Sequence, residues 1–347
     1  MRVVLPANKN RFQSIQYLRA FAALIVIFHH ALRPRPWLYN PISQYGAGQA
    51  GVDIFFVISG FIMYSAARKE GVGQFAWRRF VRIAPLYWLA TLVTFIILES
   101  RLHFQPVGPN MLDLLQSILF IPHYNRIVPD QVWPYLVPGW TLNFEAFFYL
   151  IFAIGLVTKK LVPTVLILLV ALIIAGVLFP SRSAIWLTYT NPLLAEFLGG
   201  LLIARFQDQI VRPLTIFLLP LGILGLAVSA FVPAPRVLIW GLPALAIVIG
   251  ALSLERSGHL PDWRFAAALG DGSYSIYLFQ VIGIGVATAI VQHLPLHGVP
   301  QLACMIVGAL ACAIALGMAA HYLVERPLTR YLTRRRSAAR LDVLAAP

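Results

Sequence analysis

The sequence predicts an all-α fold, a polytopic membrane bundle of about ten transmembrane helices with both termini in the cytoplasm. Three observations support this prediction. Of the 347 residues, 59% are hydrophobic and only 12% are charged, whereas a soluble domain has about 45–50% apolar and about 25% charged residues. Several stretches are long and apolar enough to cross a bilayer. Lys and Arg residues gather in alternate connecting segments.

This composition excludes an ordinary soluble enzyme, a disordered chain and a nucleic-acid binder with a basic soluble surface. The mean hydropathy of +0.78 points the same way. The two cysteines, Cys304 and Cys312, lie in one apolar run. On a helix they would be about 12 Å apart along the axis, too far for a disulfide bond. The sequence therefore offers neither a disulfide framework nor a zinc site.

A spanning helix needs about 20 mostly apolar residues. The predicted spans, in chain order, are 14–33, 46–67, 82–99, 138–158, 161–180, 190–206, 213–232, 236–254, 266–291 and 301–324. The first span precedes Arg33-Pro34-Arg35-Pro36, so we expect a retained helix and not a cleaved signal peptide. Span 190–206 is short and is interrupted by Glu196.

The connecting segments predict a single domain. Met111–Ile121 is too short to cross the membrane and indicates an amphipathic or re-entrant piece of the loop at 100–137. No repeat or long linker divides the chain. We therefore expect one domain over 1–347, with a membrane core at about 10–335 and a cytoplasmic tail at 336–347.

The orientation follows from the positive charges. One set of loops and tails carries 20 Lys and Arg residues and the opposite set carries six, while Arg19 lies inside the first span. Positive residues favour the cytoplasmic side, so both termini are predicted to be cytoplasmic. The net charge of +14 is then a topology signal and implies no nucleic-acid partner.

Arg19 and His30 are the first candidate functional pair. Eleven residues separate them, which places them within about 20° of the same helix face and roughly 16 Å apart along the axis. His29 is turned about 80° away from that face. Ionisable groups within a span usually face an interior cavity. The alternative is that Arg19 snorkels to the inner interface and His30 caps the outer helix end.

Two carboxyl groups lie within neighbouring spans. Asp53 opens the second span at a depth comparable to that of His30, and Glu145 enters the fourth span from the same side. A carboxylate beside a histidine fixes its tautomer and raises its basicity, so either could orient His30. The alternative is a polar cluster that holds helices together.

An arginine cluster precedes the third span. Arg78, Arg79 and Arg82 have spacings of three and four residues, which on a helix allow convergence on a multiply charged phosphate group. The same residues also suit plain topology determination.

The ninth span carries Ser273, Tyr277 and Gln280 on one face. Such a face suits substrate contact or hydrogen bonding between helices. A metal site at His293 and His297 is not expected, because Pro295 separates them in a loop. The sequence contains no nucleophile elbow, P-loop or dinucleotide fingerprint.

Six motifs in order give the chain a family resemblance. They are Leu18-Arg19 with Arg19-x10-His30; Gly51-Val52-Asp53-Ile54-Phe55-Phe56-Val57-Ile58-Ser59-Gly60-Phe61; Arg79-x2-Arg82-Ile83-x-Pro85-x-Tyr87-Trp88; Trp140-Thr141-Leu142-x2-Glu145-x2-Phe148-Tyr149; Ser273-Tyr274-Ser275-Ile276-Tyr277-Leu278; and Glu325-Arg326-Pro327. With these motifs the chain resembles the acyltransferase 3 family of integral-membrane acyltransferases, in particular the bacterial O-acetyltransferases of exopolysaccharides and surface glycans.

The resemblance implies an O-acyltransferase of the bacterial inner membrane that moves an acyl group, usually acetyl, from cytoplasmic acetyl-CoA to a glycan or lipid-linked oligosaccharide hydroxyl. Polysaccharide-biosynthesis proteins and membrane lipid are the implied partners, without a metal. His30, Arg19, Glu145 and Asp53 are then the expected catalytic residues. The residues assigned to the donor are Arg78, Arg79, Arg82, Tyr87, Ser273 and Tyr277.

Two departures and two alternatives accompany this hypothesis. The family often has His in place of Gln280 and Ser in place of Thr141, which argues against a catalytic role for the ninth span. A transporter of acyl groups or lipid-linked sugars would also need intramembrane charges. An acyltransferase acting on a small lipophilic molecule would share the same machinery. Direct transfer and an acyl-enzyme both stay open, because no serine or cysteine is paired with a base.

Overall fold

The structure is a computed structural model that describes residues 12–102 and 110–333. Over these residues the chain forms helices and no β-strand, and ten helical segments are long and apolar enough to cross a membrane. The predicted fold class is therefore confirmed. The predicted tail at 336–347 lies outside the described residues. Cys304 and Cys312 are both free, as expected.

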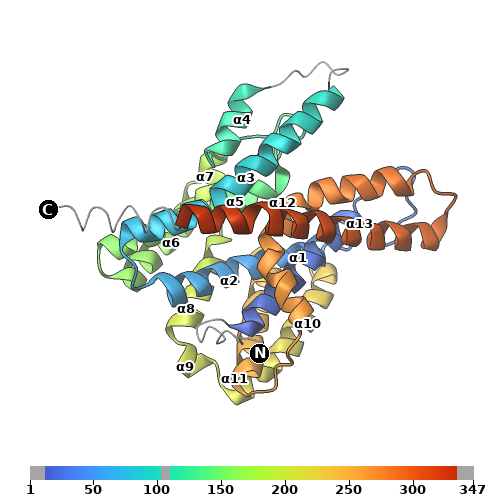
Figure 1. The fold of residues 1–347 in the computed structure, drawn as a ribbon. Coiled ribbons are helices and arrows are strands. Elements are labelled where there is room, and N and C mark those ends of the chain that lie inside the picture. The colour runs from blue at the N-terminus through green and yellow to red at the C-terminus, as the bar shows by residue number, and fades with distance from the viewer. Residues whose placement is uncertain (1–11, 103–109, 334–347) are drawn as a thin grey trace, which may run out of the picture.

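Thirteen α-helices follow one another along the described chain (Figure 1). They are α1 (Gln13–Ala31), α2 (Ala50–Ala67), α3 (Val72–Leu102), α4 (Met111–Ile118), α5 (Trp140–Val157), α6 (Leu161–Leu178), α7 (Ala184–Tyr189), α8 (Leu194–Arg205), α9 (Gln207–Ile210), α10 (Leu218–Val228), α11 (Leu242–Arg256), α12 (Arg264–Val291) and α13 (Gly298–Ala320). Short 3-10 turns occupy Ala47–Gln49, Val137–Gly139, Pro213–Phe217 and Ser229–Phe231, and π-helical turns occupy Val237–Gly241 and His321–Glu325. We call the end of the bundle where α1 begins the inner end, and the end where α1 finishes the outer end.

Two predicted boundaries differ from the structure. Helix α3 begins at Val72, ten residues before the predicted start at 82, so the arginine cluster lies on the helix and not in a loop. The predicted span 190–206 contains only α8, whereas the segment long enough to cross a membrane is Ala184–Arg205 and consists of two helices, α7 and α8. They are separated at Asn191 and Pro192, because proline has no backbone N–H and disfavours helical geometry in the residue before it. The Oδ1 atom of Asn191 accepts a hydrogen bond of 3.0 Å from the Leu193 N–H and stabilises the break.

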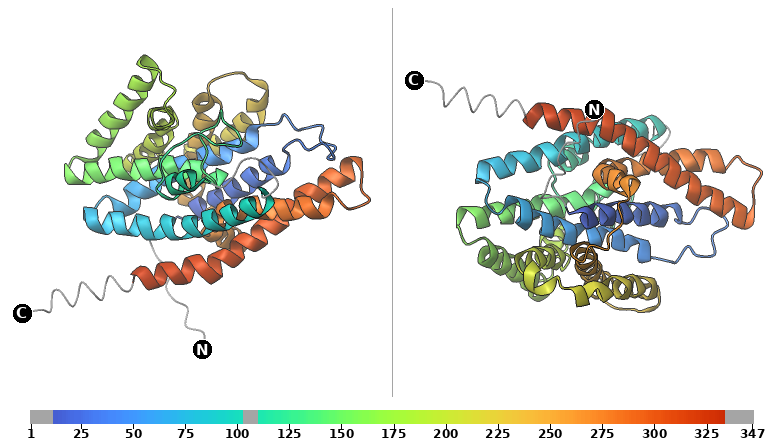
Figure 2. Two further views of the ribbon diagram at one scale, coloured as in Figure 1. Left: turned by 90° about the horizontal axis from the view of Figure 1, so that it is seen from above. Right: turned by 60° about the horizontal axis from the view of Figure 1, so that its bottom comes forward.

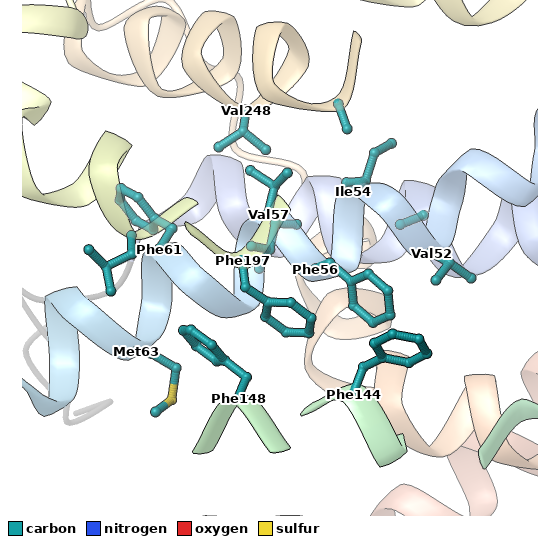
Figure 3. Close-up of a cluster of buried hydrophobic side chains, with 14 of the residues drawn as sticks. Val52, Ile54, Phe56, Val57, Phe61, Met63, Phe144, Phe148, Phe197 and Val248 are labelled. Carbon is teal, nitrogen blue, oxygen red and sulfur yellow. The ribbon is translucent and has the colours of Figure 1, made fainter. Parts of the chain in front are cut away.

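Helix α2 forms the centre of the core, where it packs against α1, α8 and α11. Close-up Figure 3 shows Phe56 of α2 and Phe197 of α8 beside the rings of Phe144 and Phe148 from α5. The Phe56 and Phe148 rings both stack on Phe197, with centroid separations of 4.5 Å and 4.7 Å. This aromatic cluster fixes α8 against α2 and α5, the two helices of the three that line the candidate site.

Two glycines bring α2 and α8 into direct backbone contact. A Cβ atom on Gly60 would lie 2.0 Å from the carbonyl oxygen of Phe197, and one on Gly200 would lie 1.9 Å from that of Val57. Small residues that allow such an approach are typical of helix interfaces in membranes.

Helix α12 lies between α1 and α13, and α13 runs along it on the side away from α2 (Figures 1 and 2). Helix α4 packs on α3 at the outer end. Its exposed Met111, Leu112 and Leu115 fit the predicted amphipathic piece. Tyr87 and Trp88 of α3 anchor it by donating hydrogen bonds of 3.0 Å and 2.8 Å to the last carbonyl groups of α4.

Candidate active site

An inner cavity of about 90 Å³ lies among α1, α2, α3, α5 and α12. Its charged lining consists mainly of guanidinium groups. The polar and aromatic lining residues are Arg19, Phe55, Phe56, Ser59, Arg79, Arg82, Thr141, Glu145, Tyr149, Ser273, Tyr274 and Tyr277. With three arginines and one carboxylate in the lining, this cavity favours an anionic ligand.

The arginines of the inner cavity are held by different contacts. Arg19 is only 8% exposed, and its Nη1 donates to Oε1 of Gln16 at 3.2 Å. The Arg79 guanidinium lies 6.0 Å from the centre of the Tyr149 ring, and its buried Nε has no hydrogen-bond acceptor within residues 12–102 and 110–333. An N–H group buried without an acceptor is costly, which points to a ligand atom at that position.

Arg78 does not join this cluster. It forms an ion pair of 2.6 Å with Glu70, and its side chain is about half exposed. Arg78 is absent from the cavity lining, although Arg79 and Arg82 both contribute to it. The predicted convergence of three arginines is therefore reduced to two, because the Arg78 guanidinium is paired with Glu70 outside the cavity.

Glu145 belongs to the inner cavity and not to the surroundings of His30. Tyr149 donates a short hydrogen bond to Oε1 of Glu145, and the Ser59 hydroxyl donates a second one of 3.4 Å. The hydrogen bond from Ser59 connects α2 with α5, and the one from Tyr149 lies within α5. The carboxylate is thus placed beside the arginines.

An outer cavity of about 630 Å³ opens among the outer ends of α1, α2 and α5, helix α7 and the loop before α5. Its polar and aromatic lining residues are His29, His30, Arg33, Gln49, Asp130, Gln131, Trp133, Trp140, Phe144, Thr188, Asn191, Arg236 and Tyr277. The His29 and His30 rings have centroids 5.3 Å apart. Among the described residues no carboxylate is paired with His30.

Asp53 is engaged elsewhere and does not orient His30. It is fully buried and accepts two hydrogen bonds from Arg236, 3.1 Å from Nε and 2.8 Å from Nη2. A buried carboxylate requires such a counter-charge. Glu196 is buried on α8 close enough to Asp53 for their two side chains to interact. The expected His30–Asp53 pair is therefore replaced by an Arg236–Asp53 pair.

The two cavities meet at Val52 and Tyr277, which line both. The Tyr277 hydroxyl donates to the carbonyl oxygen of Pro138 and accepts a hydrogen bond from Thr141, both at 3.2 Å. Arg19 therefore lines the inner cavity and His30 the outer one, on the same helix. The predicted single polar stripe is divided into two compartments by the Tyr277 ring.

The other residues predicted to bind the acyl donor differ in where the structure places them. Ser273 is fully buried, lines the inner cavity, and its hydroxyl has no hydrogen-bond partner. Tyr87 lines neither cavity, because its hydroxyl is used by the carbonyl oxygen of Ser117. Gln280 is also buried, and its Nε2 donates to the Tyr277 carbonyl oxygen at 2.9 Å. The polar face of α12 thus serves both the cavity and the helix packing.

Arg236 and the cluster around Glu325 are not among the site residues predicted from the sequence. Arg236 was counted only as one of six basic residues in the outer loops, although its place directly before an apolar span was a signal. Glu325 accepts hydrogen bonds from Ser275 at 2.6 Å and from Nδ1 of His321 at 2.8 Å. These contacts connect the Glu325-Arg326-Pro327 motif with the serine-rich motif of α12. In the part of the chain that the structure describes, no group of three His, Cys, Asp or Glu side chains could hold a metal ion.

Comparisons with known proteins identify the family of this chain. Residues 12–318 match the acyltransferase 3 family model, described as an acyltransferase domain. The chain is 37% identical over 315 residues to the exopolysaccharide production protein ExoZ of Rhizobium meliloti, covering 86% of this chain and 95% of that protein. It is 25% identical to the acyltransferase MdmB of Streptomyces mycarofaciens over 96% of both chains. No solved structure matches the chain.

Proposed function

Because the chain belongs to the acyltransferase 3 family and is therefore a multi-pass membrane acyltransferase, we propose that it moves an acetyl group from cytoplasmic acetyl-CoA to a sugar hydroxyl. The acceptor is a cell-surface glycan or exopolysaccharide, or its lipid-linked precursor, at the bacterial inner membrane. The relative ExoZ is named for exopolysaccharide production and supports this acceptor class.

The observation that carries the proposal is the pair of cavities that meet at Tyr277. An enzyme whose donor and acceptor arrive from opposite sides of a membrane needs two entrances and one meeting point. The inner cavity offers guanidinium groups for an anionic donor. The outer cavity offers imidazoles, indoles and amides for a polar acceptor.

On the donor side, Arg79 and Arg82 bind the phosphate groups of coenzyme A, since guanidinium forms bidentate hydrogen bonds with phosphate oxygens. The pantetheine arm then brings the thioester into the inner cavity beside Arg19. A volume of about 90 Å³ suits an acetyl group better than a long acyl chain.

On the acceptor side, His30 acts as the general base. Its imidazole accepts the proton of the acceptor hydroxyl as the oxygen attacks the thioester carbon. The carbon–sulfur bond breaks, the acetyl ester forms, and the coenzyme A thiolate takes up a proton. Direct transfer requires the thioester to pass Tyr277. Transfer through an acyl-enzyme would use a group at this boundary, and both routes fit the arrangement.

The test is acyl transfer by the purified protein in detergent. Labelled acetyl-CoA and an oligosaccharide acceptor are expected to give labelled, ester-linked product. A transporter would bind either compound without forming that product, and an enzyme for lipophilic molecules would label such an acceptor in place of the sugar. Ester analysis of cell-surface glycans, with and without the gene, supplies the matching test in cells.

A further inference from the structure

The outer cavity contains two arginines beside the histidines, Arg33 and Arg236. The hydroxyl chemistry proposed above needs only a base and an acyl donor. Two guanidinium groups in a cavity that receives a neutral sugar have no role in that chemistry. Their surroundings indicate what they bind.

Arg236 is fixed in place. Its Nε and Nη2 donate hydrogen bonds to the Asp53 carboxylate. The indole rings of Trp140 and Trp240 lie 5.6 Å and 4.9 Å from the guanidinium carbon. These contacts leave Nη1 without a hydrogen-bond acceptor among the described residues. Because the guanidinium cannot turn away, Nη1 is an oriented donor in the wall of the cavity.

Arg33 has no carboxylate to balance its charge among the described residues. Burial lowers the pKa of its guanidinium from the ordinary value, which reflects partial removal from water. Its neighbour Arg35 differs, because Arg35 Nη1 donates to the carbonyl oxygens of Ala31 and Arg33 at 2.9 Å and 3.1 Å and does not line the cavity. Arg33 alone therefore presents an unbalanced positive charge to this space.

Both arginines line the outer cavity together with His29 and His30. His29 lies within electrostatic range of Arg33 and Arg236, and His30 within range of Arg33. Among the residues that the structure describes, Asp130 is the one carboxylate in the lining; it is exposed and is not paired with either arginine. An anionic group bound between Arg33 and Arg236 would lie next to the proposed base.

We propose that the acceptor is anionic, and that Arg33 and Arg236 bind its negative group, a sugar carboxylate or a lipid-carrier phosphate, beside His30. This inference rests on the proposed function. It assigns the two arginines the task of recognising the acceptor and orienting its hydroxyl.

Three acceptors with one common neutral backbone test the proposal: the neutral oligosaccharide, the same oligosaccharide with a glucuronic acid residue, and the neutral oligosaccharide attached to a lipid pyrophosphate. With labelled acetyl-CoA, kcat/KM is expected to be at least about tenfold higher for an anionic acceptor, since hydrogen bonds to charged groups are worth about 1.5–3 kcal/mol. The acceptor preferred identifies the source of the negative charge.

Arg33→Gln is the decisive variant and Arg35→Gln its matched control. Arg33→Gln is expected to lower kcat/KM for the anionic acceptor by roughly 10- to 100-fold. The ratio of kcat/KM for the anionic acceptor to that for the neutral one then falls to about one. Arg33→Lys should retain part of the preference, and Arg35→Gln all of it. Size-exclusion profiles check that the variants are folded.

Equal kcat/KM values for all three acceptors would overturn the inference while leaving the proposed function intact. Equal losses in Arg33→Gln and Arg35→Gln would also overturn it. A wild-type protein that transfers nothing from acetyl-CoA to any acceptor would defeat the proposed function, and this inference with it.

Discussion

At the scale of single residues, the two histidines at the end of α1 differ in their expected roles. Both line the outer cavity, yet His30 shares the helix face of Arg19 and His29 is turned away from it. A general base contributes typically 10²- to 10⁴-fold to a rate. His30→Ala is therefore expected to lower kcat by about that factor without loss of folded protein, and His29→Ala much less.

The measurement for this pair is acyl transfer by purified variants matched for their size-exclusion profiles. Near-normal activity in His30→Ala would reject its assignment as the base. Loss of activity in both variants to the same degree would instead indicate a shared structural role.

The arginines of α3 provide a second comparison at this scale. Arg79 and Arg82 line the inner cavity, whereas Arg78 is paired with Glu70 at the surface. Arg79→Ala with Arg82→Ala should raise the KM for acetyl-CoA at least about tenfold, from the loss of charged hydrogen bonds. Arg78→Ala is the control and should leave the KM within about twofold, because exposed ion pairs contribute little.

Initial rates at varied acetyl-CoA concentration check this prediction. An unchanged donor KM in the double variant would contradict donor binding by this pair. A similar increase in Arg78→Ala would show that the effect is a general one of positive charge at the inner end.

At the scale of helices, the close backbone contact between α2 and α8 allows a direct test of how the helices pack. Because Gly60 and Gly200 each face a backbone carbonyl group of the other helix, a methyl group cannot be added without separating the helices. Overpacking of this kind costs about 1–3 kcal/mol. Gly60→Ala and Gly200→Ala are expected to lower the thermal unfolding temperature, measured in detergent.

Gly285 of α12 supplies the control, because a Cβ atom at that position would meet no atom within 4 Å. Gly285→Ala should leave the unfolding temperature unchanged or raise it slightly, since alanine favours helix. An equal decrease in all three variants would show that the close α2–α8 contact is not what makes the first two substitutions costly.

The helices also show which parts of the fold could be predicted from the sequence. Runs of about 20 apolar residues predicted the spans well, because a bilayer imposes that length directly. The start of α3 was placed too late because the segment from Val72 to Arg82 is amphipathic and lacks the hydropathy of a span. The split between α7 and α8 was missed, although Pro192 was the available signal.

The site was predictable only in part, for a physical reason. An ionisable residue within an apolar span is easily recognised in the sequence, so Arg19, His30, Asp53 and Glu145 could be named as candidates. Which of them meet depends on how distant helices pack. Asp53 is paired with Arg236, which is 183 positions away in the chain, and no periodicity within either helix encodes that contact.

At the scale of the whole molecule, the bundle separates two compartments across its thickness. The inner cavity has Arg19, Arg79 and Arg82, the outer cavity has the two histidines, and Tyr277 lies between them. The excess of Lys and Arg in one set of loops predicts that the inner end faces the cytoplasm. The central claim is therefore directional: the donor enters at the inner end and the acceptor at the outer end.

Reconstitution in sealed liposomes with known orientation tests this claim most directly. Labelled acetyl-CoA is supplied on one side only and the oligosaccharide acceptor on the other. We expect labelled ester product only when acetyl-CoA is on the side of the inner end and the acceptor on the side of the outer end, and none with His30→Ala. Product formed equally from either arrangement, or only with both substrates on one side, would contradict the account.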